Sequence, residues 1–359
     1  MVRAFILSVF LFAAALPAVA ASYDAPAEGE YVVDRFVFQS GEELEGLRLH
    51  YRTIGALRHD ADGKASNAVL VMHGTTGSGA SLLRESFAGE LFCAGCLLDA
   101  RKYFIILPDG IGHGASSKPS DGLRMDFPQY DYDDMVKAQH LLLTEHLGVD
   151  RLRLVMGTSM GGMQSWMWAY KYPHFVDAAM PLASLPVEIA GRNRMTRQMI
   201  VDAIKADPAW NNGDYDPAES DFAGMRAAMH ALVFMVSSPL QYQKAAPTRA
   251  EAEMMLEDMV NRYATALDPN DTIYAFEASR TYDPSSHLEK IVAPLTAINS
   301  ADDQVNPPEL RILESEIRKV AGGNAVVLPI TDETRGHGTH SVASIWKHHL
   351  AALLEASER

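Results

Sequence analysis

Short apolar segments alternate with helical patterns along most of the chain. Residues 31–38 and 47–53 alternate apolar and polar positions, as the two strands of an antiparallel edge hairpin do. Six later segments are apolar strand patterns: 68–72, 103–107, 152–156, 177–182, 294–299 and 325–329. The first two are unbroken apolar runs, as in strands buried on both faces, and 152–156 repeats that pattern. Helical patterns cover 133–147 and about 341–355. This alternation predicts an α/β fold, with a mostly parallel central sheet and helices on both faces.

The pattern changes between residues 186 and 287, where we find no convincing strand. Methionines recur there at helical spacings: Met195, Met199, Met225, Met229, Met235, Met254, Met255 and Met259. An amphipathic helical cap that packs on the main domain explains them, and their flexible side chains could also line an apolar substrate pocket. We therefore predict a core of residues 21–185 and 288–359, interrupted by a helical cap, or lid, at 186–287.

The N-terminal segment has the features of an export signal. Arg3 precedes an apolar run over residues 4–16, and the small residues Ala18 and Ala20 form a cleavage pattern. The run is shorter than the roughly 20 residues that a spanning helix needs, which disfavours an uncleaved anchor. We expect a signal peptide at 1–20 that is cleaved after Ala20, and a periplasmic or secreted protein with no stable membrane anchor.

Charge and cysteine content exclude several classes of function. The chain has 31 Lys and Arg against 46 Asp and Glu, a net charge of −15, and such a surface repels nucleic-acid backbones. Two cysteines are too few for a disulfide-dense scaffold or a four-cysteine zinc site. Cys93 and Cys96 lack a thioredoxin-like context, so we expect a surface loop without a catalytic role, and the spacing leaves open whether a disulfide closes it.

The strongest chemical signal is the sequence Gly-Thr-Ser-Met-Gly-Gly at 157–162, which follows a predicted strand and begins a helix. A nucleophile elbow requires this order, because a tight turn lifts the serine hydroxyl above the sheet. Ser159 is therefore the candidate nucleophile. The N–H of Met160, at the helix N-terminus, is the first candidate donor to an oxyanion.

A serine nucleophile needs a base and a group that orients the base, and in this architecture the acid and then the histidine follow the serine along the chain. Asp302 and Asp303 come directly after the strand predicted at 294–299, and spacing alone does not separate them. His337 lies between two glycines in a loop after the last strand, and His340 is its rival at the start of the final helix.

Two glycine-containing loops follow earlier strands. The first, at 73–78, allows a close backbone approach, and Thr75 in it is the candidate for the second oxyanion donor. The second, at 109–114, lacks the patterns of dinucleotide and P-loop sites. We assign it to the pocket wall, with His113 as a substrate contact.

Several longer segments resemble the homoserine O-acetyltransferase family of α/β-hydrolase-fold enzymes. The matching pieces are NAVLVMHGTTGS (67–78), the run at 127–152, GTSMGGMQSWMWAYKYP (157–173), AIKADPAWNNGDY (203–215), SADDQVNPPEL (300–310) and GHG (336–338). The resemblance implies an α/β-hydrolase fold. It also selects Asp303, which lies four residues before the first proline of the Pro-Pro pair, and His337. Related transferases pair through cap helices, so the resemblance further implies a homodimer of that kind.

The chain departs from this family where the amino-acid substrate is recognised. Val201 stands where the resemblance implies an arginine, six residues before the Asp-Pro pair, and Gly338 stands where it implies an aspartate. The family's Gly-Ser-Thr-Gly-Pro loop is replaced by the sequence at 110–122. We therefore place Val201 and Gly338 in the substrate pocket and interpret homoserine recognition as lost.

These observations predict an exported serine hydrolase that cleaves a small-molecule acyl ester, or a related acyl bond, through an acyl-enzyme. Ser159 attacks, His337 transfers protons and Asp303 orients the imidazole. No metal or organic cofactor is implied. One alternative is an acyltransferase of the homoserine O-acetyltransferase type, with an alcohol or amine acceptor. The other is a non-catalytic binding protein on a hydrolase scaffold.

Overall fold

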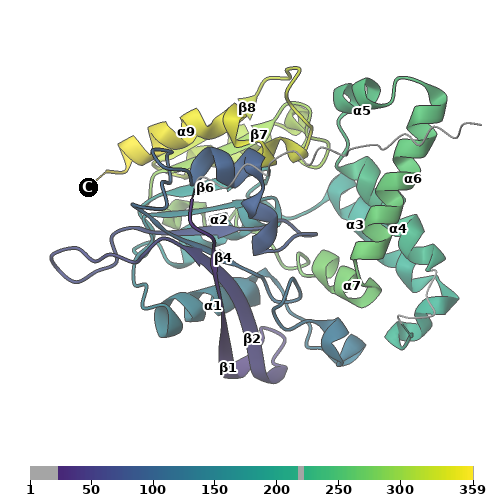
Figure 1. Ribbon diagram of the computed structural model, residues 1–359, viewed down its shortest axis with the longest axis horizontal. Coiled ribbons are helices and arrows are strands. Elements are labelled where there is room, and N and C mark those ends of the chain that lie inside the picture. Colours follow the sequence, from purple (N-terminus) through teal and green to yellow (C-terminus); the bar gives the residue numbers. More distant parts are fainter. Residues whose placement is uncertain (1–22, 217–221, 359) are drawn as a thin grey trace, which may run out of the picture.

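A computed structural model describes residues 23–216 and 222–358, and its centre is one eight-stranded sheet (Figure 1). The strands are β1 (Ala27–Val37), β2 (Glu43–Ile54), β3 (Ala68–Met72), β4 (Phe104–Pro108), β5 (Leu154–Thr158), β6 (Ala179–Leu182), β7 (Leu295–Ser300) and β8 (Gly323–Leu328). Their order in the sheet is β1-β2-β4-β3-β5-β6-β7-β8. β2 pairs antiparallel with both β1 and β4, and the other pairs are parallel. The predicted mostly parallel sheet is confirmed, with the ends of its parallel strands shifted by two residues at most.

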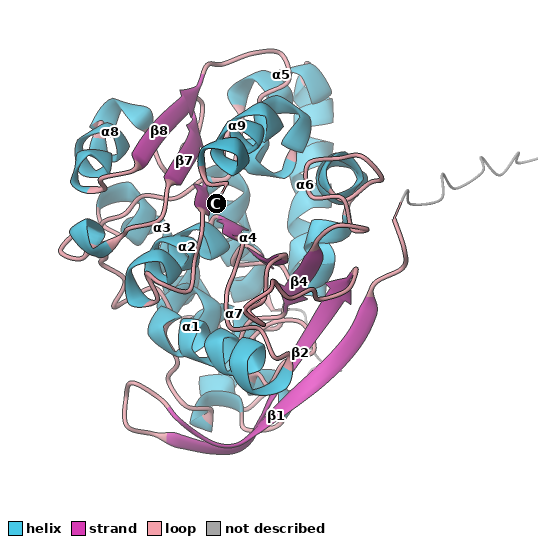
Figure 2. Ribbon diagram, turned by 90° about the vertical axis from the view of Figure 1, so that its left-hand side faces the viewer, coloured by secondary structure: helices cyan, strands magenta, loops and turns pink. Residues whose placement is uncertain are grey.

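Helices cover both faces of the sheet. They are α1 (Tyr132–Leu141), α2 (Met160–Lys171), α3 (Gly191–Lys205), α4 (Ala223–Met235), α5 (Pro239–Ala245), α6 (Arg249–Ala266), α7 (Pro269–Glu277), α8 (Ile312–Glu316) and α9 (Ala343–Ala356). One apolar core contains side chains of α1, α2 and α8, and the other contains side chains of α9 and of the short helical segments at 79–89. Figure 2 shows the twisted sheet between α1 and α2 on one side and α9 on the other.

The alternation of side chains along the strands explains the two cores. In β3, Leu70 and Met72 belong to one core, whereas Val69 and Val71 belong to the other, and all four are buried. Successive side chains of a strand point to opposite faces, so a strand covered on both faces needs an unbroken apolar sequence. The segment Ala68–Met72 has that sequence.

Helices α3 to α7 form the segment between β6 and β7 and lie beyond one end of the sheet (Figure 1). They have an apolar core of their own, which includes the buried Met225 and Met229. Met195, Met199 and Met254 are exposed instead, at 66%, 58% and 61%. The methionine spacing therefore reflects mainly the two faces of amphipathic helices. No helix in the described ranges combines the length and the apolar character that crossing a bilayer requires.

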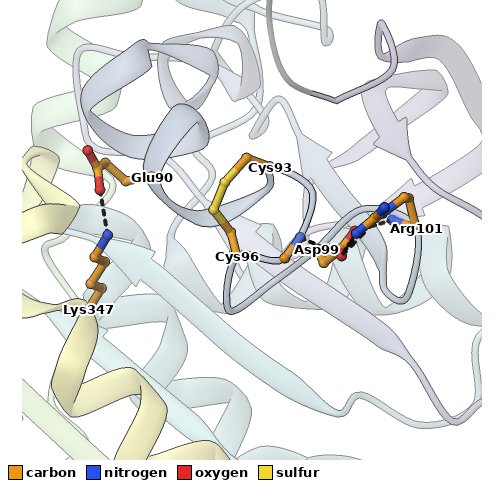
Figure 3. Close-up of a disulfide and its surroundings, with 7 residues drawn as sticks. Glu90, Cys93, Cys96, Asp99, Arg101 and Lys347 are labelled. Carbon is orange, nitrogen blue, oxygen red and sulfur yellow. Dashed lines mark hydrogen bonds and ion pairs between the residues drawn. A yellow bond between two sulfur atoms is a disulfide. The ribbon is translucent and has the colours of Figure 1, made fainter.

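The two cysteines form a disulfide in a surface turn that lies before β4 (Figure 3). Gly95, inside the turn, donates its N–H to Asp99 at 2.8 Å, and Arg101 pairs with the same carboxylate. The disulfide therefore closes this loop, which the spacing of the two cysteines alone could not decide. The predicted signal peptide at 1–20 lies outside the described residues.

Candidate active site

Ser159 occupies a strained turn between β5 and α2. Its backbone has φ 55° and ψ −109°, a conformation that a residue with a side chain rarely adopts and that is typical of functional sites. A Cβ atom on Gly161 would lie 2.2 Å from the carbonyl oxygen of Met72, and one on Gly162 would lie 2.3 Å from that of Leu182. The two glycines therefore allow α2 to start directly against the sheet, which holds the serine at the strand end.

The structure brings together the three side chains that the sequence suggested, from segments far apart in the chain. The Nε2 atom of His337 lies 2.8 Å from the Oγ atom of Ser159, and its Nδ1 atom lies 2.9 Å from Oδ2 of Asp303. Burial alone would raise the pKa of Asp303, but the adjacent His337 and several hydrogen bonds hold it below its ordinary value. Asp303 is therefore an anion that fixes the imidazole with Nε2 toward the serine.

The rival residues have other positions. Asp302 accepts hydrogen bonds from the Gly336 N–H at 2.9 Å and from the Ser300 hydroxyl at 2.5 Å, so it braces the loop that carries His337. His340 packs its ring against that of His337, with ring centres 5.4 Å apart. Burial lowers the pKa of His340 to about 3, which keeps this second imidazole neutral.

The loop that contains Thr75 is held by His73. The carbonyl of Gly74 accepts hydrogen bonds from Nδ1 of His73 at 2.8 Å and from the Gly77 N–H at 3.0 Å. Since a trans peptide directs its C=O and N–H oppositely, these bonds aim the Thr75 N–H to the other side. Nε2 of His73 accepts the Gly110 N–H at 3.0 Å, so the ring proton is on Nδ1. Burial, followed by the neighbouring His113, lowers the pKa of His73 to about 4.

Thr75 and Met160 both lie where an oxyanion could be bound. Thr75 lines a cavity with Ser159, and no hydrogen bond from its N–H to another described residue is formed. Met160 is the first residue of α2, where the N–H groups have no partner within the helix. Met160 directly follows Ser159 and Thr75 lines the cavity with it, so the two N–H groups stay the candidate oxyanion donors.

The assignment of His113 to the substrate pocket needs correction. Its ring lies behind the loop at 73–78, which we call the oxyanion loop. Nε2 of His113 is 2.8 Å from the Thr75 carbonyl, and Nδ1 is 2.9 Å from the Ile111 carbonyl. It lines neither of the cavities that reach Ser159. The sequence showed a glycine-containing loop at a strand end but not that the imidazole turns toward the neighbouring loop, where it ties the two loops together.

A buried carboxylate fixes both loops to the sheet. Asp109 accepts the N–H of Gly79 at 2.7 Å, the N–H of Ala115 at 3.0 Å and a contact from His50 at 2.9 Å. Burial alone would raise its pKa, but the hydrogen bonds from Ala115 and Gly79 and nearby positive charge, including that of Arg52, hold it below its ordinary value. Asp109 therefore anchors the far end of the oxyanion loop.

Two cavities meet at the nucleophile, and Ser159 and Arg197 line both. The first cavity, of about 370 Å³, lies between the oxyanion loop, the His337 loop and side chains of α4 and α6. The second cavity, of about 410 Å³, lies between the segment at 183–193 and the segment at 305–312. Gly338 lines the first cavity, as predicted.

Val201 does not lie in either cavity, which corrects its placement in the substrate pocket. It is buried in the apolar core of the cap, where it packs with side chains of α4. Its distance along the chain from the Asp-Pro pair does not show which turn of α3 faces the serine.

Arg197 is the functional candidate that the sequence analysis missed. It lies one helical turn before Val201 and is only 2% exposed. Its guanidinium donates to Asn193 at 2.9 Å and to Ser279 at 3.3 Å, and it lies 5.6 Å from the ring centre of Phe276. No carboxylate of the described chain forms a salt bridge with it. A search for arginines one turn from the expected position could have found it.

No group of three or more His, Cys, Asp or Glu side chains in the described ranges is arranged to hold a metal ion. The polar groups at the serine are the imidazole and carboxylate described above, the backbone donors and Arg197. This arrangement can activate a hydroxyl nucleophile, stabilise an oxyanion and attract a negatively charged substituent.

Comparison with known proteins identifies similar chains. A family model described as the alpha/beta hydrolase fold matches residues 67–316, which contain Ser159 and Asp303. A probable acyltransferase of Methanothermobacter thermautotrophicus is 32% identical over 281 residues, 78% of this chain and 84% of that protein. A homoserine O-acetyltransferase of Chlorobaculum parvum is 30% identical over 328 residues, 85% and 87% of the two chains. The solved structure of the acetyl esterase MekB is 25% identical, with a TM-score of 0.80 over 92% of this chain and 97% of that one.

The protonation of His73 predicts an acid-sensitive fold. Its pKa is about 4 in the folded chain and about 6.5 when unfolded, so the unfolded state binds the extra proton first as the pH falls. The unfolding free energy should therefore fall between pH 6.5 and 4, by on the order of 3 kcal/mol from this residue. Denaturant titrations across this range measure it.

His73→Asn is the matched control, because its amide can still donate to the Gly74 carbonyl but does not titrate. Its unfolding free energy should depend less steeply on pH, by up to about 1.4 kcal/mol per pH unit between the two pKa values. Equal slopes for the wild type and this variant would contradict the assignment of a neutral, buried His73.

Proposed function

The chain belongs to the α/β-hydrolase fold family as a homoserine O-acetyltransferase-like member, and from this premise we propose that it is a serine acyltransferase with an alcohol or amine acceptor. The observation that carries the proposal is the imidazole of His337 between the hydroxyl of Ser159 and the carboxylate of Asp303. The export signal and the departures from the family sequence favour hydrolysis over transfer. Relatives that match over most of both chains are named as acyltransferases and favour transfer.

In the proposed reaction, the Oγ atom of Ser159 attacks the acyl carbonyl while Nε2 of His337 takes the hydroxyl proton. The N–H groups of Thr75 and Met160 stabilise the oxyanion, and His337 then protonates the departing alcohol or thiol. The acyl group remains on Ser159. An acceptor hydroxyl or amine next loses its proton to His337, attacks the acyl-enzyme and releases the product with the serine restored.

Arg197 supports an acceptor or donor that carries a negative charge. A buried guanidinium without an anionic partner is costly, and a bidentate carboxylate or phosphate would offset that cost. Because Arg197 lines both cavities, such a group would be held close to the acyl-enzyme. Binding of this kind favours transfer over hydrolysis, since the acceptor then competes with water at a high local concentration.

Hydrolysis is the second candidate, because the acetyl esterase MekB has a similar fold over nearly the whole chain at 25% identity. Both reactions use the same acyl-enzyme and differ only in the molecule that attacks it. The ratio of transfer to hydrolysis is therefore the quantity that separates them.

We also propose that the protein is exported. The segment at 1–20 has the charge, length and small residues of a cleavable signal. The Cys93–Cys96 disulfide supports this proposal, because such bonds persist mainly in oxidising compartments.

The two adjacent aspartates should respond differently to removal of charge. Asp303→Asn should lower kcat by about 10⁴-fold, the loss seen when a triad aspartate no longer fixes the imidazole tautomer. Asp302→Asn, the matched control one residue away, should lower it far less, because Asp302 contacts the loop backbone and not the ring. Steady-state ester cleavage measures both, and an equal or larger loss in Asp302→Asn would contradict the assignment.

Acceptor partitioning should distinguish transfer from hydrolysis. With an activated ester as donor, a hydroxy acid acceptor should give transfer product in preference to free acid, and its uncharged amide should give at least tenfold less. Arg197→Met should remove that preference, because the guanidinium no longer binds the carboxylate. Product analysis by mass spectrometry measures the ratio. Free acid as the only product with every acceptor tested would establish the hydrolase instead.

Export can be checked on the protein itself. After expression of the full chain in a bacterium with an outer membrane, the mature protein should occur in the periplasm or medium, with Ala21 as its first residue. Replacing Ala18 and Ala20 with bulky residues should leave the precursor uncleaved. An intact N-terminus on protein recovered from the cytoplasm of wild-type cultures would rule out the proposed signal.

A further inference from the structure

The second cavity offers a separate space for one part of the substrate. Its inner wall is formed by buried side chains, among them Met163 of α2 and Val305, close to Ser159. Partly buried Val187 and Ile189 continue the wall, and Leu310, which is 56% exposed, lies at the outer end. The cavity is thus a mainly apolar passage that runs from the nucleophile toward the surface.

The position of His337 decides which part of the substrate enters this passage. The group that leaves must be within reach of Nε2 of His337, which donates the proton to it. His337 lines the first cavity and not the second, and so do the residues of the oxyanion loop. The leaving group and, after it, the acceptor therefore occupy the first cavity.

The tetrahedral intermediate has four substituents on its central carbon. One is the Oγ atom of Ser159, one is the oxyanion beside Thr75 and Met160, and one is the oxygen or sulfur that leaves toward His337. The fourth is the carbon chain of the acyl group. Once the first three are placed at or beside the first cavity, the second cavity, formed by described residues, is a space that reaches Ser159 and holds none of them.

Resting on the proposed function, we infer that the second cavity is the acyl pocket and that the protein prefers apolar acyl groups longer than acetyl. Its volume of about 410 Å³ is in the range of pockets that enclose whole small ligands, whereas an acetyl group has a single methyl to bury. Of the charged residues on the cavity, Glu188, Arg192 and Glu309 are exposed and therefore lie at the mouth. The buried Arg197 lines both cavities, so an acyl chain that extends toward the mouth leaves this guanidinium beside the acceptor and meets no buried acid on the way.

The inference predicts how rates depend on chain length. With p-nitrophenyl esters of acetate, butyrate, hexanoate and octanoate, kcat/KM should rise with the chain, by up to about fourfold for each methylene that becomes fully buried. Ser159→Ala should abolish all four reactions. Highest activity on the acetate, with a steady decline toward octanoate, would overturn the acyl-pocket assignment and leave the proposed serine chemistry intact.

Two tryptophan variants test which cavity holds the acyl chain of the substrate. Val187→Trp narrows the second cavity and should lower the octanoate-to-acetate ratio of kcat/KM at least tenfold. Val236→Trp, the matched control, adds the same bulk to the first cavity and should change that ratio less than twofold, because all four esters share one leaving group. Thermal melting verifies that each variant is folded, and Ile189→Trp replaces Val187→Trp if that variant is not.

Each outcome decides between the two proposals. A ratio that falls in Val236→Trp and not in the variants of the second cavity would place the acyl chain in the first cavity and overturn the inference. Failure of the wild type to turn over any of the four esters, or activity that survives in Ser159→Ala, would instead overturn the proposed function on which the inference rests.

Discussion

The left-handed backbone of Ser159 is the constraint on which the other features of the site depend. The strained backbone at φ 55° persists because α2 packs directly against the sheet beside β5, which leaves the chain no room for a relaxed turn. Glycines lie at the points of contact. The same turn aims the hydroxyl at His337 and leaves the N–H of Met160 free at the start of α2. A bulkier residue at Gly161 would push the helix away from the sheet and separate these groups.

Polar groups below the surface hold the loops around that turn. Neutral His73 orients the peptide whose N–H faces the cavity, and Asp109 anchors the end of the same loop. Asp302 holds the backbone beside His337 in the same way, because it accepts the N–H of Gly336. These contacts lie behind the reacting groups, so the site is preorganised before a substrate binds.

The sheet and the order of the site residues along the chain could be predicted from the sequence, because both depend on local patterns. Unbroken apolar runs such as Ala68–Met72 identified strands covered on both faces, and the glycines around Ser159 identified the turn. Spacing could not separate Asp302 from Asp303, which depends on which carboxylate turns toward the ring. His113 and Val201 were placed in the substrate pocket but line neither cavity at Ser159, for a similar reason: a residue's position along the chain does not show which neighbour its side chain contacts.

Two cavities share one serine and one buried arginine, and this arrangement underlies the proposed chemistry. An acyl group and an acceptor can approach Ser159 from different sides, and both depend on that hydroxyl as a covalent nucleophile. Labelling with a fluorophosphonate, followed by peptide mass spectrometry, tests this claim most directly. We expect one phosphonylated residue, Ser159, with labelling slowed at least a hundredfold in His337→Gln. Absence of label on the folded wild type, or label on another residue, would contradict it.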